Sequence, residues 1–218
     1  MEILALLGVL LLVYLSFAVS ASAGLGGSLV LVPTLVVFLG SKEGIALAAL
    51  LLASNNVLKI ATYRKTLPFR AAVGVVLLLV LGAAAGSALL VAAPVWVVTA
   101  GVVAMFVATL IAERFELQLA RAGFAPVLSF ASGATSGFSG TSGPLKGVAI
   151  RNLDLDRRHF VGAASLASFA GDATKTAIFA EAGLLALDHG GQLVIRKGKC
   201  HHLPKTLFEH DDQSGDSH

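Results

Sequence analysis

The chain has 218 residues, of which 56% are hydrophobic and 13% charged, and its mean hydropathy is +0.84. Soluble domains carry about a quarter charged residues, so most of this chain cannot face water. The net charge of +3 is spread over short loops, which argues against a nucleic-acid surface. The apolar runs are continuous and do not alternate, which excludes a transmembrane β-barrel and predicts an all-α polytopic membrane protein.

Five apolar stretches are long enough to cross about 30 Å of hydrocarbon, namely 3–22, 45–62, 70–92, 95–112 and 160–181. The first stretch resembles the core of a signal peptide, but its acidic start, Met1-Glu2, favours a retained helix. Shorter apolar segments at 28–39, 125–136 and 143–150 flank two stretches rich in small and hydroxyl residues. These stretches are SASAGLGGSLVLVP at 20–33 and TSGFSGTSGP at 135–144, and the second is not expected to hold a regular helix.

Lys and Arg in short loops mark the cytoplasmic side of a membrane. Basic residues therefore place the loops 63–70, 113–123 and 151–159 inside. The segment that contains TSGFSGTSGP then leaves and returns on one side, either as two spans or as a re-entrant loop. This topology divides the chain into a first membrane repeat, a cytoplasmic amphipathic connection, a second, incomplete repeat and a polar tail expected to be disordered. The four parts are 1–112, 113–124, 125–187 and 188–218.

An internal repeat supports this division. Two sets of residues match, the first at an offset of 113 and the second at an offset of 116. They are Gly24 and Gly27 with Gly137 and Gly140, then Asn56, Lys59 and Tyr63 with Asp172, Lys175 and Phe179. The helix over 45–62 runs inward, whereas its counterpart over 160–181 runs outward. The sequence therefore predicts two inverted repeats with broken or re-entrant helices, an architecture of secondary transporters.

We expect the two Gly/Ser/Thr stretches to form an anion site. Half-helices that begin near Ser28 and Ser142 would point free N–H groups and positive dipole ends inward. Glycine permits close approach of the backbone, and hydroxyl groups add donors. The candidate substrate-binding residues are Gly24, Gly26, Gly27, Ser28, Gly137, Ser139, Gly140, Thr141 and Ser142. The alternative is that the glycines only let helices pack closely, which we favour for GAAAGSA at 82–88.

Ionisable residues at membrane depth usually mark a substrate or proton path. Lys175 lies well inside 160–181, and Asp172 stands three residues earlier as a local ion-pair partner. Lys59 follows Asn55 and Asn56, although it is near enough to a loop to snorkel. These five residues complete the predicted substrate site.

We expect no enzyme and no cofactor. GFSG at 137–140 matches the G-x-S-G of intramembrane serine proteases, but all six His lie in loops or in the tail, where they cannot act as its base. The single cysteine, Cys200, excludes an internal disulfide and a multi-Cys metal site. The tail sequence CHH lacks ordered ligand spacing, so no metal site is expected either.

Four stretches together resemble the sulfite exporter TauE/SafE family of membrane transporters, over roughly 1–185. They are AGLGGSLVLVPTL, SNNVLKIATYRKTL, SGATSGFSGTSGPL and FAGDATKTAIFAEAGLL. The resemblance implies export of a small sulfur-containing anion, such as sulfite or an organosulfonate, by a multi-pass protein of the cell (inner or plasma) membrane.

The expected partners are the anionic substrate and the lipid bilayer, without nucleic acid. A coupling proton or sodium ion and a homo-oligomer are left open. The family pattern would continue with membrane helices where this chain has LDHGGQLVIRKGKCHHLPK. The alternative function is therefore a truncated, non-transporting subunit that a partner completes.

Overall fold

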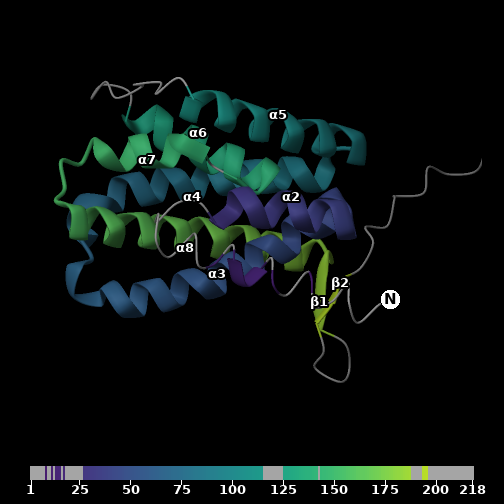
Figure 1. Cartoon of the computed structure of the whole chain (residues 1–218), viewed down its shortest axis with the longest axis horizontal. Helices are drawn as coiled ribbons and strands as arrows, with labels where there is room; N and C mark the ends of the chain where they lie inside the picture. Colours follow the sequence, from purple (N-terminus) through teal and green to yellow (C-terminus); the bar gives the residue numbers. More distant parts are fainter. Residues whose placement is uncertain are drawn as a thin grey trace, which may run out of the picture.

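The computed structural model describes residues 8, 11, 13–15, 17, 27–114, 125–141, 143–187 and 193–195 (Figure 1). The described part is mainly helical, which confirms the predicted all-α class. Its helices are α2 (Gly27–Leu39), α3 (Ser41–Tyr63), the short 3-10 helix η1 (Arg64–Thr66), α4 (Phe69–Ala92), α5 (Val95–Arg114), α6 (Ala125–Ser139), α7 (Gly143–Arg151) and α8 (Arg157–Glu181). Within the described residues, Ser41–Thr66 and Phe69–Ala92 are long and apolar enough to cross a membrane.

The helix ends follow from local backbone chemistry. Gly40 separates α2 from α3 with a φ of 98°, a left-handed conformation that favours glycine. Helix α4 ends at Ala92 because Pro94 pushes the residue before it, Ala93, out of the helical region. The predicted spans at 45–62, 70–92, 95–112 and 160–181 therefore correspond to α3, α4, α5 and α8. Most of the predicted span 3–22 lies outside the described residues.

A short β-hairpin follows α8 and was not predicted. β1 (Leu185–Leu187) pairs antiparallel with β2 (Leu193–Ile195), and Ala186 lies opposite Val194. Leu184 and Leu185 are buried in the apolar core beside Phe179, which anchors the start of the hairpin. β2 falls within the predicted tail 188–218, and the rest of that tail lies outside the described residues.

Helices α6 and α7 form a helical hairpin that returns to the end from which it starts, in agreement with the predicted return on one side. Gly133 of α6 packs on α4 at Leu79 and Gly137 packs on it at Ala83, so α6 and α4 are parallel and enter from the same end. α7 returns to that end, where Ile150 packs near Ala72. With rises of about 1.5 Å per residue, α6 is about 22 Å long and α7 about 14 Å. Over its described residues, each helix is shorter than a membrane core of about 30 Å.

The predicted break over 135–144 is wrong in extent, because α6 remains helical through Ser139. Hydroxyl groups within this stretch donate to carbonyls one turn earlier, as Thr135 does to Ala131 and Ser139 does to Thr135. These bonds keep the side chains compatible with a helix. The break is therefore short and begins at Gly140.

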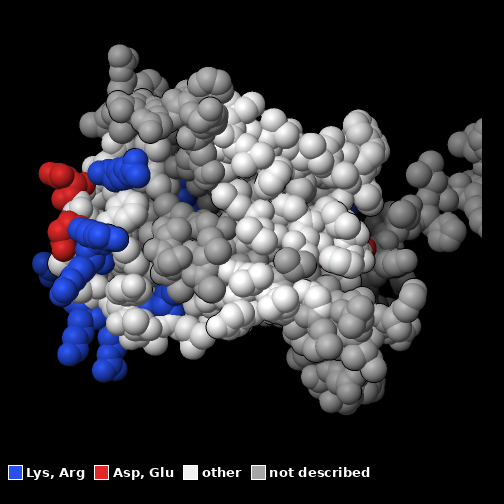
Figure 2. Space-filling model, viewed as in Figure 1, with Lys and Arg blue, Asp and Glu red and all other residues white. Residues whose placement is uncertain are grey.

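The short helices α2 and α7 run toward opposite ends of the molecule. α2 leads to the start of α3, where Lys42 donates a hydrogen bond to the carbonyl of Val91 near the end of α4. α7 leads to the other end, where the Thr66 carbonyl lies against Gly162 of α8. Lys and Arg side chains gather at this second end, on the left of Figure 2. The loops 63–70 and 151–159 thus share one end, as predicted.

Candidate functional site

A buried group of polar side chains joins α3, α6 and α8 in the interior. The Lys175 Nζ atom lies 2.6 Å from Asp172 Oδ1, and Lys175 is 0% exposed. Asn56 donates from Nδ2 to Asp172 Oδ2 over 2.8 Å, and Lys175 donates to Ser136 Oγ over 3.0 Å. The structure therefore forms the ion pair that the sequence predicts and adds Asn56 and Ser136 to it. We call Asn56, Ser136, Asp172 and Lys175 the polar centre.

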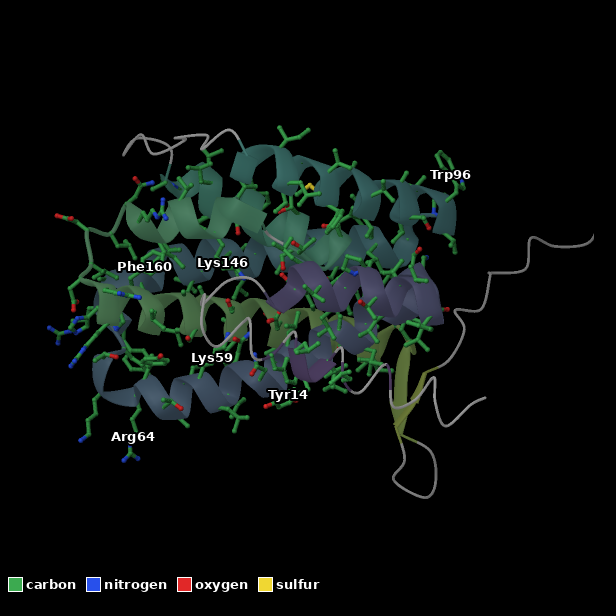
Figure 3. All side chains as sticks on the ribbon, in the orientation of Figure 1. Tyr14, Lys59, Arg64, Trp96, Lys146 and Phe160 are labelled. Atoms are coloured by element: carbon green, nitrogen blue, oxygen red, sulfur yellow. The ribbon has the colours of Figure 1, made fainter. Side chains whose placement is uncertain are left out.

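Lys59 faces this interior and does not snorkel. Its side chain is only 9% exposed, and its charge interacts with that of Asp172. Figure 3 shows Lys59 on the part of α3 that faces α8, whereas Arg64 points away at the basic end. Lys59 therefore contributes positive charge to the polar centre, as its position in the sequence suggested.

Lys146 of α7 is a further cation that the sequence interpretation missed. It donates from Nζ to Ser168 Oγ of α8 over 3.1 Å and is partly buried. Among the described residues, no carboxylate lies within ion-pair distance of it. Its charge interacts with those of Asp172, Lys175 and Lys59. The sequence GPLKG shows a lysine within an apolar segment, but only the return of the hairpin brings this lysine to α8.

Four buried donors have no hydrogen-bond partner among the described residues, and two of them stand next to members of the polar centre. These two are the Ser132 hydroxyl and the Asn55 amide nitrogen, and the others are Ser87 Oγ and Asn152 Nδ2. Ser132 precedes Ser136 by one turn on the same face of α6, and Asn55 is adjacent to Asn56. Buried polar groups are nearly always satisfied, so these two donors are free for a bound group. Asn55 was predicted as a site residue, whereas Ser132 was not.

The tip of the hairpin formed by α6 and α7 is packed and internally bonded. Gly140 has a φ of 78°, and a Cβ there would lie 3.0 Å from side-chain atoms of Val32 and 3.3 Å from Ile45. The Ser139 hydroxyl donates to the carbonyls of Thr135 and Thr141, at 2.8 and 3.2 Å. In this structure the hydroxyl hydrogen of Ser139, a predicted substrate donor, is therefore shared within the tip. Thr141 is buried beside it.

Gly137 lies at the contact between α6 and α4. It lies inside α6, and a Cβ would meet the backbone of α4 at Ala83 and Ser87. Gly82 and Gly86 face α6 in the same way, which confirms the packing role favoured for GAAAGSA. These glycines let the two helix backbones come into contact. Gly137 therefore lies within α6 at its contact with α4, and not in the break that the sequence predicted.

The predicted half-helix starts agree with the structure to within one residue. α2 begins at Gly27, which is buried, and Ser28 is partly buried. α7 begins at Gly143. The remaining predicted site residues, Gly24, Gly26 and Ser142, lie outside the described residues.

Comparison with known families gives one match. The family model described as Sulfite exporter TauE/SafE matches residues 7–195. No curated protein and no solved structure gives a match. The matched region contains every residue of the polar centre, together with Lys59 and Lys146.

Proposed function

Because the chain belongs to the sulfite exporter TauE/SafE family, whose members are membrane transporters rather than enzymes, we propose that it exports a small sulfur-containing anion across the cell membrane. Sulfite or an organosulfonate is the proposed substrate. The observation that carries this proposal is the charge of the interior. Among the described residues, Lys146 and Lys175 both interact with one carboxylate, that of Asp172, which leaves one positive charge in excess, and the charge of Lys59 also interacts with Asp172.

Cationic side chains inside a membrane protein are costly, so their presence calls for a bound partner. Asp172 supplies one negative charge, and an anion would supply the rest. The free donors of Ser132 and Asn55 are suited to oxygen atoms of such an anion. We infer that substrate competes with Asp172 for Lys175 and contacts Lys146 on the neighbouring helix.

The inverted repeat is the proposed basis of alternating access. Two observations support it. The short helices α2 and α7 run toward opposite ends, and each is followed by a long helix that runs back across the molecule. In addition, Asn56 and Asp172, which the repeat aligns, are hydrogen-bonded to each other. That contact is expected where a local two-fold axis passes between α3 and α8.

The test is sulfite efflux from vesicles that contain the purified chain. Lys175→Met should abolish efflux, and Lys146→Met should raise the substrate concentration needed for half-maximal rate by about 10- to 150-fold, the equivalent of one charged hydrogen bond. Lys42→Met is the matched control, because Lys42 bonds to Val91 at the opposite end of α3. Wild-type efflux from the Lys175 and Lys146 variants would disprove the proposed site. Efflux that appears only with an added partner would support the subunit alternative.

A further inference from the structure

A second group of cations borders a pocket at the basic end, apart from the polar centre. The pocket has a volume of about 540 Å³, within the usual range for small-molecule sites. Its walls are the last turn of α3 together with η1, over 61–66, and Arg158 from the first turn of α8. Arg64, Lys65 and Arg158 supply three positive charges, and no described carboxylate borders it.

The excess of basic residues at this end is expected for a cytoplasmic surface, but the hollow is not. Asp154 and Asp156 belong to the adjacent connection between α7 and α8, yet neither borders the pocket. Cations from two separate elements thus face one concave surface, and none of them forms an ion pair with a described carboxylate. Arginine guanidinium groups present paired N–H donors that match the oxygens of oxyanions.

The walls of the pocket are fixed relative to each other. The carbonyl of Thr66 lies so close to Gly162 that a Cβ at position 162 would clash with it. The Thr66 hydroxyl also donates to the carbonyl of Tyr63. Near Arg158, the carboxylate of the N-cap residue Asp156 bonds to His159 and does not border the pocket.

The pocket also lies next to the interior cations. Thr62 and Tyr63, which border it, follow Lys59 by three and four residues and so lie one turn further along α3. Figure 3 shows Arg64 at the end of the molecule, beyond Lys59. An anion held in the pocket would be one helical turn from the first interior lysine.

We propose that the pocket bounded by 61–66 and Arg158 is an oxyanion-binding site that is distinct from the polar centre. Its ligand presents sulfite, sulfonate or phosphate oxygens to Arg64, Lys65 and Arg158. Two sources supply this chemistry: a soluble anion that enters from the basic end, and the phosphate of an anionic lipid headgroup. The assignment does not depend on transport, because it concerns binding at a different set of residues.

The experiment compares Arg158→Gln with Arg157→Gln in the purified full chain. Both residues are exposed in the first turn of α8, but only Arg158 borders the pocket. One arm titrates sodium sulfite into protein in neutral detergent by calorimetry. The other measures phosphatidylglycerol retained on the protein by native mass spectrometry, with phosphatidylcholine as reference. Arg158→Lys, which keeps the charge, is a second variant.

Arg158→Gln should weaken one of the two probes about tenfold or more, whereas Arg157→Gln should leave it unchanged and Arg158→Lys should recover part of the loss. Loss of sulfite binding identifies a soluble anion, and loss of retained phosphatidylglycerol identifies a lipid headgroup. If Arg158→Gln and Arg157→Gln behave alike toward both probes, the assignment is overturned. That result would leave the efflux test of Lys175 unaffected, so the two proposals fail separately.

Discussion

Replacing Lys175 by methionine would leave the Asp172 carboxylate buried with Asn56 as its remaining partner in the polar centre. Lys175 is 0% exposed, so solvent does not screen the pair. At 2.6 Å and an effective dielectric constant of about 20, the attraction is about 6 kcal/mol, part of which offsets desolvation. Removal of one partner of a buried pair costs about 3–5 kcal/mol, which is our expectation for the free energy of unfolding.

The double variant Lys175→Met/Asp172→Asn separates this charge effect from packing. An asparagine at 172 can still accept the hydrogen bond from Asn56, and it removes the carboxylate that the single variant leaves without Lys175. Lys146 then has no nearby carboxylate among the described residues, so only part of the lost stability should return. Unfolding is measured in mixed micelles as the denaturing detergent fraction rises, followed by circular dichroism. A single variant that costs less than about 1 kcal/mol, or a double variant whose loss equals the sum of the single losses, would refute the reasoning. Wild-type efflux from the double variant would show that the pair is only structural.

Three further predictions concern packing, hydroxyl groups and topology. Gly133→Ala should destabilise the fold by about 1–3 kcal/mol, because its Cβ would meet the α4 backbone. Gly74→Ala is the control and should leave stability unchanged in thermal unfolding, because the space around Gly74 is open. Ser132→Ala should leave stability unchanged but weaken sulfite binding in calorimetry, because its hydroxyl has no partner among the described residues; Ser129→Ala, whose hydroxyl bonds to a backbone carbonyl, is the control. Because the loop 151–159 is predicted inside and one span follows it, the tail after 188 is expected outside, and Cys200 should react with an impermeant maleimide in intact cells. Labelling only after permeabilisation would reverse the predicted orientation.

The long helices could be predicted from hydropathy because their apolar runs match the thickness of a membrane. The charged pair in α8 was also accessible, since Asp172 and Lys175 are three residues apart and both lie far from any loop. The offset of 116 likewise identified two positions that prove to be hydrogen-bonded. In each case a local or periodic signal was sufficient.

The extent of the break and the role of Lys146 could not be predicted in this way. Composition alone makes TSGFSGTSGP resemble a loop, but Ser139 satisfies its hydroxyl on the helix backbone and Gly137 packs on α4. The packing of Gly137 depends on a neighbouring helix, and the bond of Ser139 depends on α6 being already helical; composition identifies neither. Lys146 reaches Ser168 only because the chain reverses at Gly140, and that contact joins residues of two different helices.

The hydrogen bond between Asn56 and Asp172 has a consequence for the origin of the two halves. On a two-fold axis a residue meets its own copy, so an ancestor assembled from two identical halves would have placed the same side chain on both sides. Two carboxylates at this distance would repel, and two amides would leave the neighbouring lysines without a counter-ion. An amide facing a carboxylate requires the two copies to differ. Under the proposed repeat, joining the halves in one gene is therefore what allows this centre to carry a single negative charge.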